Sequence, residues 1–140
     1  MAEGPSERPE HPLLPVPVLE RDPDFSRLLH QRFDHLPNFD VVAGDVRNLT
    51  AILAERGIGQ VDSVISGLPV PSFPRDLQRD LFRVVKQILA PAGTFNQITE
   101  LPWVYWRFYK TFFDEVRFVF EPRNFPPAGA YFCRGVKDLP

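Results

Sequence analysis

The sequence predicts an α/β fold with a parallel sheet, helices on both faces and an antiparallel pair of strands at the C-terminal end. Segments with the period of a helix alternate with short β-branched strands along most of the chain. Such alternation favours parallel strands joined by crossover helices. The last two predicted strands have no helix between them, so we expect them to pair antiparallel.

The N-terminal elements follow from proline and capping signals. Residues 1–14 are rich in proline and glutamate and predict a disordered or extended tail. The apolar run over 15–20 contains two prolines, which make it a poor central strand. Asp22-Pro23-Asp24 supplies an N-cap, a first-turn proline and an acid, so a helix should begin there. Its apolar face should consist of Phe25, Leu28, Leu29 and Phe33.

The remaining elements are predicted from periodicity, glycine and proline. A strand over 39–43 ends at Gly44-Asp45, and a short helix containing Leu49, Ile52 and Leu53 stops at Gly57. A β-branched strand covers 61–66, and the clearest helix runs from Pro74 through Leu89. The chain should then form a tight turn over 91–93, a strand over 94–99, a helix over 102–113 and strands over 116–121 and 130–135.

Composition narrows the function classes. The chain has 140 residues, about one domain, and a net charge of −2, which argues against a general nucleic-acid binder. Its single cysteine, Cys133, excludes an internal disulfide and should be a buried, inert thiol. The histidines form no metal-binding pattern, so we expect no metal. No apolar run is long enough to span a bilayer and no secretory h-region is present, so we expect a cytoplasmic protein, soluble or membrane-peripheral.

Two acids follow the first two predicted strands. Ligands of open α/β sheets bind beyond the carboxyl ends of the strands. Glu20 ends the first apolar run, where a carboxylate can accept both hydrogen bonds of a ribose diol. Asp45, 25 residues later, could accept from an exocyclic adenine amine. The plainer interpretations are a surface acid beside a helix start for Glu20 and a turn or N-cap residue for Asp45.

The third predicted strand leads into Ser66-Gly67-Leu68-Pro69. Gly67 would allow close backbone approach and Pro69 would fix the turn. Carbonyl groups in such a loop could hold a reacting amine, although an ordinary strand-to-helix loop explains the same residues.

Aromatic residues are concentrated over 103–113, where seven of eleven residues are aromatic. One helix face cannot bury them all, so some rings should be exposed, and Trp and Tyr favour a water–lipid interface. Arg107 and Lys110 are about one turn apart and could meet phosphate headgroups, whereas a core helix packed on the sheet is the plainer interpretation. The candidate substrate or membrane contacts are Trp103, Tyr105, Trp106, Arg107, Tyr109 and Lys110.

From Leu19 to about Lys137 the sequence resembles class I S-adenosylmethionine-dependent methyltransferases, and more narrowly the bacterial phospholipid N-methyltransferase group. The matching stretches are Leu19-Glu20-Arg21-Asp22-Pro23-Asp24-Phe25, Val42-Ala43-Gly44-Asp45-Val46, Val61-Asp62-Ser63-Val64-Ile65-Ser66-Gly67-Leu68-Pro69 and Ile88-Leu89-Ala90-Pro91-Ala92-Gly93-Thr94-Phe95. Ser-Gly-Leu-Pro followed by a Phe-Pro helix start is the most specific of them.

The resemblance implies a Rossmann-like sheet and the cofactor S-adenosylmethionine. By position, Glu20 would hold the ribose hydroxyls, Asp45 and Val46 would contact the adenine, and Ser66 would lie beside the cofactor. Ser66, Gly67, Leu68 and Pro69 would form the catalytic loop near the methyl donor and the acceptor amine. The activity of the group is methylation of a phospholipid amine such as phosphatidylethanolamine, for which positioning and desolvation dominate.

The sequence departs from the family before Glu20. The family opens with a strand and a glycine-rich cofactor loop, whereas Gly4 is the only glycine before Gly44. We therefore expect an incomplete methyltransferase-like domain over 15–140, lacking the first strand and this loop. A truncated chain or a wrong start at Met1 would account for it. An exposed sheet edge would favour a homodimer.

Two alternative functions remain open. A non-catalytic fragment or degenerate methyltransferase could serve as an interaction module. An rRNA adenine N-methyltransferase would carry an Asn-Leu-Pro-Tyr/Phe loop, but Gly67 stands before Leu68 here. Together with the net charge, this argues against nucleic acid, and the resemblance implies a phospholipid or small-amine substrate.

Overall fold

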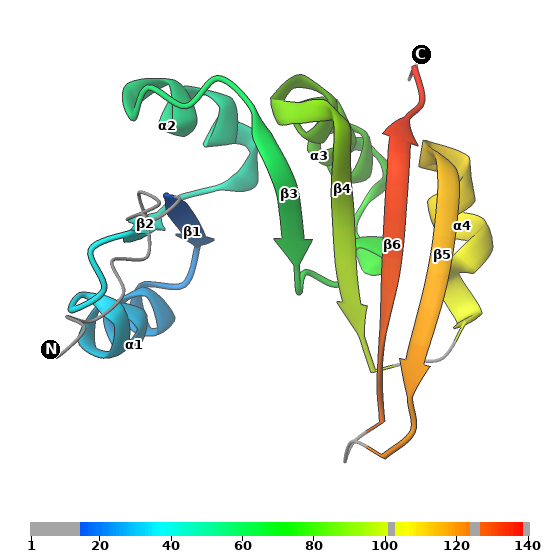
Figure 1. Cartoon of the computed structure of the whole chain (residues 1–140), viewed down its shortest axis with the longest axis horizontal. Helices are drawn as coiled ribbons and strands as arrows, with labels where there is room; N and C mark the ends of the chain where they lie inside the picture. Colours follow the sequence, from blue (N-terminus) through cyan, green and yellow to red (C-terminus); the bar gives the residue numbers. More distant parts are fainter. Residues whose placement is uncertain (1–14, 101–102, 124–126, 139–140) are drawn as a thin grey trace, which may run out of the picture. The chain divides into compact units, whose positions relative to one another are not determined.

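The structure is a computed structural model that describes residues 15–100, 103–123 and 127–138 (Figure 1). Contacts divide the chain into two units, Met1–Asp45 and Val46–Pro140, and each is described by itself. The predicted tail over 1–14 lies outside the described residues. The expected α/β fold class is confirmed.

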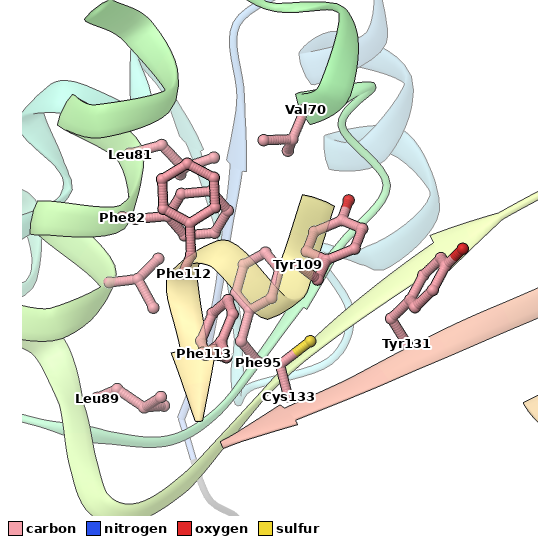
Figure 2. Close-up of a cluster of buried hydrophobic side chains, with 11 residues drawn as sticks. Val70, Leu81, Phe82, Leu89, Phe95, Tyr109, Phe112, Phe113, Tyr131 and Cys133 are labelled. Carbon is pink, nitrogen blue, oxygen red and sulfur yellow. The ribbon is translucent and has the colours of Figure 1, made fainter. Parts of the chain in front are cut away.

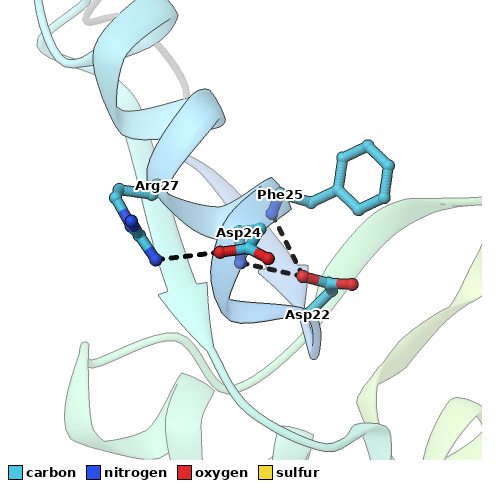
Figure 3. Close-up of polar contacts among 4 residues, drawn as sticks. All are labelled: Asp22, Asp24, Phe25 and Arg27. Atoms are coloured by element: carbon cyan, nitrogen blue, oxygen red, sulfur yellow. Dashed lines mark hydrogen bonds and ion pairs between the residues drawn. The ribbon is translucent and has the colours of Figure 1, made fainter.

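In the first unit, the strand β1 (Val16–Glu20) pairs in parallel with β2 (Phe39–Ala43), and the helix α1 (Pro23–Phe33) connects them. The helix begins where the sequence predicts. The Asp22 carboxylate accepts the backbone N–H groups of Asp24 at 2.8 Å and Phe25 at 3.3 Å, and Arg27 pairs with Asp24 at 2.9 Å (Figure 3). These bonds satisfy N–H groups that have no partner within the helix.

The apolar face of α1 is only partly covered. Phe33 stacks on Phe39 with ring centroids 5.2 Å apart. Phe25 and Leu28, which the sequence places on the same face, are 59% and 40% exposed. The two strands of this unit form a sheet too narrow to cover the whole apolar stripe of the helix.

The second unit contains a four-stranded sheet in the order β3-β4-β6-β5 (Figure 1). β3 and β4 are parallel, and β6 is antiparallel to both β4 and β5, which confirms the predicted C-terminal pair. The strands are β3 (Val61–Ser66), β4 (Leu89–Thr99), β5 (Phe113–Glu121) and β6 (Ala128–Val136). The α-helices are α2 (Leu49–Glu55), α3 (Arg75–Ile88) and α4 (Trp106–Phe112), and the short 3-10 turns are η1 (Val46–Asn48), η2 (Val70–Ser72) and η3 (Trp103–Tyr105).

Three predicted boundaries are wrong. Leu89 begins β4 instead of ending α3, and residues 91–93 belong to the same strand instead of a tight turn. The register explains this, because Val61 pairs with Leu89 and Ser63 pairs with Thr94, so the intervening residues of β4 form an irregular bulge. β5 begins at Phe113 instead of residue 116, since Phe113 pairs with Val136 on β6.

The larger core lies between α3, α4 and one face of the sheet (Figure 2). Phe82 is at its centre, fully buried, with its ring 4.3 Å from Phe112 and 5.4 Å from Phe113 between centroids. Phe95 and Cys133, paired across β4 and β6, form part of the sheet side of this core. A smaller cluster of Leu53, Val84 and Ile88 joins α2 to α3.

The opposite face of this sheet is more open. Alternation along the strands turns a second set of apolar side chains away from the core. Its exposed members are Ile65 at 74%, Ile98 at 53%, Val119 at 49% and Phe132 at 36%. Across the described parts of the chain, the helices are too short or too polar to span a bilayer.

Candidate cofactor and acceptor site

The structure brings Glu20 and Asp45 to the same edge of the first unit. Glu20 is the last residue of β1 and pairs with Ala43, the last residue of β2. The Gly44 amide then donates to the Glu20 carbonyl at 3.1 Å, so the chain leaves β2 beside Glu20. Glu20 therefore ends β1 and Asp45 follows β2, at the carboxyl ends of adjacent parallel strands, and both acids are half-buried.

The Glu20 carboxylate already has one local partner. Its Oε1 accepts the Asp22 amide at 3.0 Å, which holds the side chain against the start of α1. A carboxylate offers about four acceptor positions, so capacity for a diol remains. Val46, also predicted at this site, begins η1 and packs its side chain against the larger core of the second unit.

The predicted loop Ser66–Pro69 lies in the second unit, at the carboxyl end of β3. Ser66 is 8% exposed, and its Oγ accepts the Leu68 amide at 3.2 Å. Gly67, Leu68 and Pro69 are exposed. A Cβ built on Gly67 meets no atom within 4 Å, so there is open space beside this residue.

Two of the loop carbonyls are occupied by the chain itself. The Leu68 carbonyl accepts the Val70 amide at 2.8 Å and Gln97 Nε2 at 2.7 Å. The Pro69 carbonyl accepts the amide and the hydroxyl of Ser72 at 3.0 and 2.7 Å. A carbonyl oxygen has two lone pairs, so neither group has capacity left for a ligand.

The Gly67 carbonyl has a fixed direction. It shares a peptide plane with the Leu68 N–H, and the two groups point opposite ways because the peptide is planar and trans. Since Ser66 Oγ holds the Leu68 N–H, it also orients the Gly67 carbonyl. Gly67 therefore combines an oriented acceptor with open space.

Sequence reasoning missed two glutamines, one that holds this loop and one that holds η2 directly after it. Gln78, on the core side of α3, donates its Nε2 to the carbonyls of Val70, Pro71 and Phe73 at 3.2, 3.3 and 3.0 Å. Gln97 holds Leu68 from β4. The available signal was polarity at positions where the helix and strand patterns require apolar side chains.

The aromatic segment divides between core and surface. Tyr109 is 1% exposed and Phe112 is 8% exposed, so both belong to the core. Trp106 is 39% exposed and Arg107 is exposed, while Tyr105 and Lys110 are half-buried. The side chain of Trp103 lies outside the described part of the chain.

Contacts also restrain the exposed side of this segment. The Trp106 indole N–H donates to the Val116 carbonyl at 3.2 Å. Lys110 Nζ donates to the Asp114 carbonyl at 3.1 Å and lies 5.4 Å from the Trp106 ring centroid. Trp106 is thus held on β5 with part of its ring exposed.

Known structures share this fold. The N-methyltransferase NodS from Bradyrhizobium japonicum, solved with S-adenosyl-L-homocysteine, matches at a TM-score of 0.63 and 12% identity over 86% of this chain and 66% of that chain. Fibrillarin from Aeropyrum pernix, solved with bound S-adenosyl-L-methionine, matches at 0.65 and 16% identity over 85% of this chain and 55% of that chain. No family model matches the sequence.

A sequence relative decides the family. The chain is 76% identical over 128 residues to the ornithine lipid N-methyltransferase of Singulisphaera acidiphila, an alignment covering 91% of this chain and 67% of that protein. The chain belongs to the class I S-adenosylmethionine-dependent methyltransferases. This confirms the resemblance found in the sequence and assigns S-adenosylmethionine as the cofactor.

Glu20 and Asp45 are the candidate residues of this methyltransferase for the adenosine half of the cofactor. Glu20 keeps acceptor capacity, and Asp45 follows the adjacent strand at the same edge. Between Met1 and Glu20 the sequence contains a single glycine, Gly4.

Proposed function

We propose that this methyltransferase transfers a methyl group to the amine of a lipid headgroup, and that Gly67 receives the amine. The observations that carry the proposal are the fixed direction of the Gly67 carbonyl and the open space at the Cβ position of Gly67, in a chain 76% identical to an ornithine lipid N-methyltransferase. An ornithine lipid is the first candidate substrate, and phosphatidylethanolamine, which also carries a primary amine, is the second.

The loop orients the amine and does not remove its proton. S-adenosylmethionine supplies an electrophilic methyl group, so the acceptor needs only an unprotonated nitrogen whose lone pair faces that carbon. A Gly67 carbonyl that accepts one N–H fixes the direction of the lone pair. Ser66–Pro69 contains no acidic or basic side chain, so the proton released on methylation goes to solvent.

We further propose that Glu20 and Asp45 hold the adenosine. The carboxylate of Glu20 accepts both ribose hydroxyls, a bidentate contact that neutral side chains match poorly. Asp45 accepts the adenine amine. Their position at the carboxyl ends of β1 and β2 supports this assignment.

We also propose contact with the membrane surface through the exposed side of the aromatic segment. Val104 is 61% exposed beside Trp106, and the adjacent Arg107 is a cation that can meet lipid phosphate. Tyr109 faces the core and is left out of this surface. Vesicle sedimentation with anionic lipid tests the contact, and Arg107→Glu should release the protein from vesicles.

The function is tested with the purified chain and vesicles of defined composition. Tritium-labelled S-adenosylmethionine is incubated with vesicles containing ornithine lipid, phosphatidylethanolamine or neither, and label in extracted lipid is measured. Label in ornithine lipid alone supports the first candidate, and label in phosphatidylethanolamine alone supports the second. Calorimetric titration with S-adenosylhomocysteine is run in parallel, and micromolar binding corresponds to about −8 kcal/mol. Binding without label in either lipid would reject lipid methylation and favour an interaction module.

A further inference from the structure

Gln97 occupies an unusual position at the carboxyl end of β4. Its side chain is 3% exposed and lies on the core face of the sheet, between Ser66 on β3 and Tyr131 on β6. Its Nε2 donates to the carbonyls of Leu68 at 2.7 Å and Ile98 at 3.1 Å, so both amide hydrogens are used. These two acceptors settle which end of the amide is nitrogen.

The oxygen of the same amide has no partner. Gln97 Oε1 is buried and, among the described residues, no donor reaches it. A buried acceptor without a donor costs free energy, and an apolar side chain of the same size would avoid that cost. Stability alone therefore does not explain a glutamine here, whereas the bond to Leu68 does.

Tyr131 holds the aromatic segment over 103–113 in a comparable way. It pairs with Gln97 across β4 and β6, is fully buried, and its hydroxyl accepts the Tyr105 amide at 2.9 Å. Tyr105 is the last residue of η3, next to Trp106 at the start of α4. Two neighbouring polar side chains of one sheet thus each hold a different surface segment.

We propose that Gln97 and Tyr131 are positioning residues for the amine-binding side of this methyltransferase. Gln97 fixes the Leu68 carbonyl, and Ser66 fixes the Leu68 N–H, so both peptide planes of Leu68 are held. The Gly67 carbonyl is thereby kept in one direction. Tyr131 holds Tyr105, which places the exposed aromatic side chains. The inference rests on the proposed function and names the residues that shape its site.

The test separates positioning from stability by hydrogen exchange. Gln97→Met keeps the side-chain length and removes the amide. We expect exchange of the Leu68 and Val70 amides to rise about tenfold or more while the Leu81 and Val85 amides in α3 stay protected. Tyr131→Phe should raise exchange of the Tyr105 amide in the same way.

Asn96→Leu is the matched control. Asn96 is the adjacent amide on β4, on the opposite face of the sheet from Gln97, and its Nδ2 donates to Ser63 Oγ and to the Val64 carbonyl on β3. Its loss should leave the Leu68 and Val70 amides unchanged. The proposal is overturned if Gln97→Met leaves these amides protected, or if Leu81 and Val85 lose protection to the same degree, which would indicate a general structural role.

Kinetics then connect the positioning to the reaction. In Gln97→Met we expect kcat to fall about tenfold or more with the KM for S-adenosylmethionine within about twofold, since Gln97 contacts neither Glu20 nor Asp45, the residues proposed to hold the adenosine. A wild-type chain that binds S-adenosylhomocysteine but methylates neither lipid rejects the proposed function. Hydrogen exchange still decides the positioning role in that case. If the wild-type chain is active, an unchanged kcat in Gln97→Met would overturn the proposal.

Discussion

The Gly44 amide donates to the Glu20 carbonyl at 3.1 Å, and this bond sets Glu20 beside the turn that carries Asp45. The contact continues the β1–β2 ladder one residue beyond its last pair. It shows how two acids separated by 24 intervening residues reach the same edge of one small sheet. Parallel pairing alone brings their strand ends together.

The first prediction concerns cofactor affinity. Glu20→Gln keeps an oxygen for the Asp22 amide but removes the charge and one acceptor of the proposed ribose contact. A hydrogen bond to a charged group contributes about 1.5–3 kcal/mol, so the Kd for S-adenosylhomocysteine should rise about tenfold or more. Calorimetric titration measures it.

Glu55→Gln is the matched control for that titration. Its side chain is 77% exposed at the end of α2, and its ion pair with Arg56 is long, with 4.0 Å between Oε2 and the guanidinium nitrogen. Its affinity for S-adenosylhomocysteine should equal that of the wild type. Equal affinities for Glu20→Gln and Glu55→Gln would contradict the assignment of Glu20 to the ribose.

The second prediction uses the open space at Gly67. A Cβ there meets nothing within 4 Å, and the residue lies outside the positive-φ region, so Gly67→Ala should fold normally. Such a change lowers the entropy of the unfolded chain and stabilises by about 0.4–1 kcal/mol. Methyl transfer should nevertheless fall about tenfold or more, because the added methyl group occupies the space for the amine.

Gly59→Ala provides the comparison. Gly59 also has nothing within 4 Å and also avoids positive φ, but lies before β3, at the opposite end from the loop. We expect the same small gain in thermal stability and unchanged methyl transfer. If Gly67→Ala retained full activity, Gly67 would not receive the amine.

Capping residues, prolines and glycines predicted most helices and strands, because these residues fix the local backbone conformation by themselves. Asp22 and Pro23 start α1 where the capping pattern predicts, and Gly57 adopts a φ of +70° just after α2. The boundary at Leu89 failed because pairing with Val61 on β3 overrides the helical period at that residue. A single sequence contains no signal for that pairing.

The candidate site was predictable only in part. The positions of Glu20, Asp45 and Ser66–Pro69 follow from strand ends, which the sequence shows. The role of Gln97 depends on a contact with Leu68, 29 residues earlier in the chain, and no local pattern reveals it. The division of the aromatic residues also depends on the sheet, since only packing decides that Tyr109 is buried and Trp106 is not.

The third prediction concerns stability. Phe82→Ala removes the ring that contacts Phe95, Phe112 and Phe113 in a fully buried position. Such a change costs about 3–5 kcal/mol, which denaturant unfolding measures. Phe25→Ala, at a side chain 59% exposed on α1, should change stability by less than about 0.5 kcal/mol. Comparable losses for the two variants would contradict the placement of the core.

The fourth prediction is a pH dependence. Burial raises the pKa of the Cys133 thiol from 9.0 to about 12. Between these values the unfolded chain releases the thiol proton while the folded chain keeps it. Because the folded state then binds more protons, the free energy of unfolding should fall as pH rises above 9, by at most about 1.4 kcal/mol per pH unit.

Denaturant unfolding between about pH 8.5 and 9.5 reports mainly on this thiol, because ordinary tyrosines titrate near pH 10. Tyr109 and Tyr131, whose pKa burial also raises, add to the same downward slope as the pH approaches 10. Cys133→Ala should flatten the slope while lowering stability at every pH through the lost packing. The native thiol should also resist a water-soluble disulfide reagent until the protein unfolds. An equal slope in the variant, or rapid reaction of the native thiol, would show that Cys133 is accessible to water.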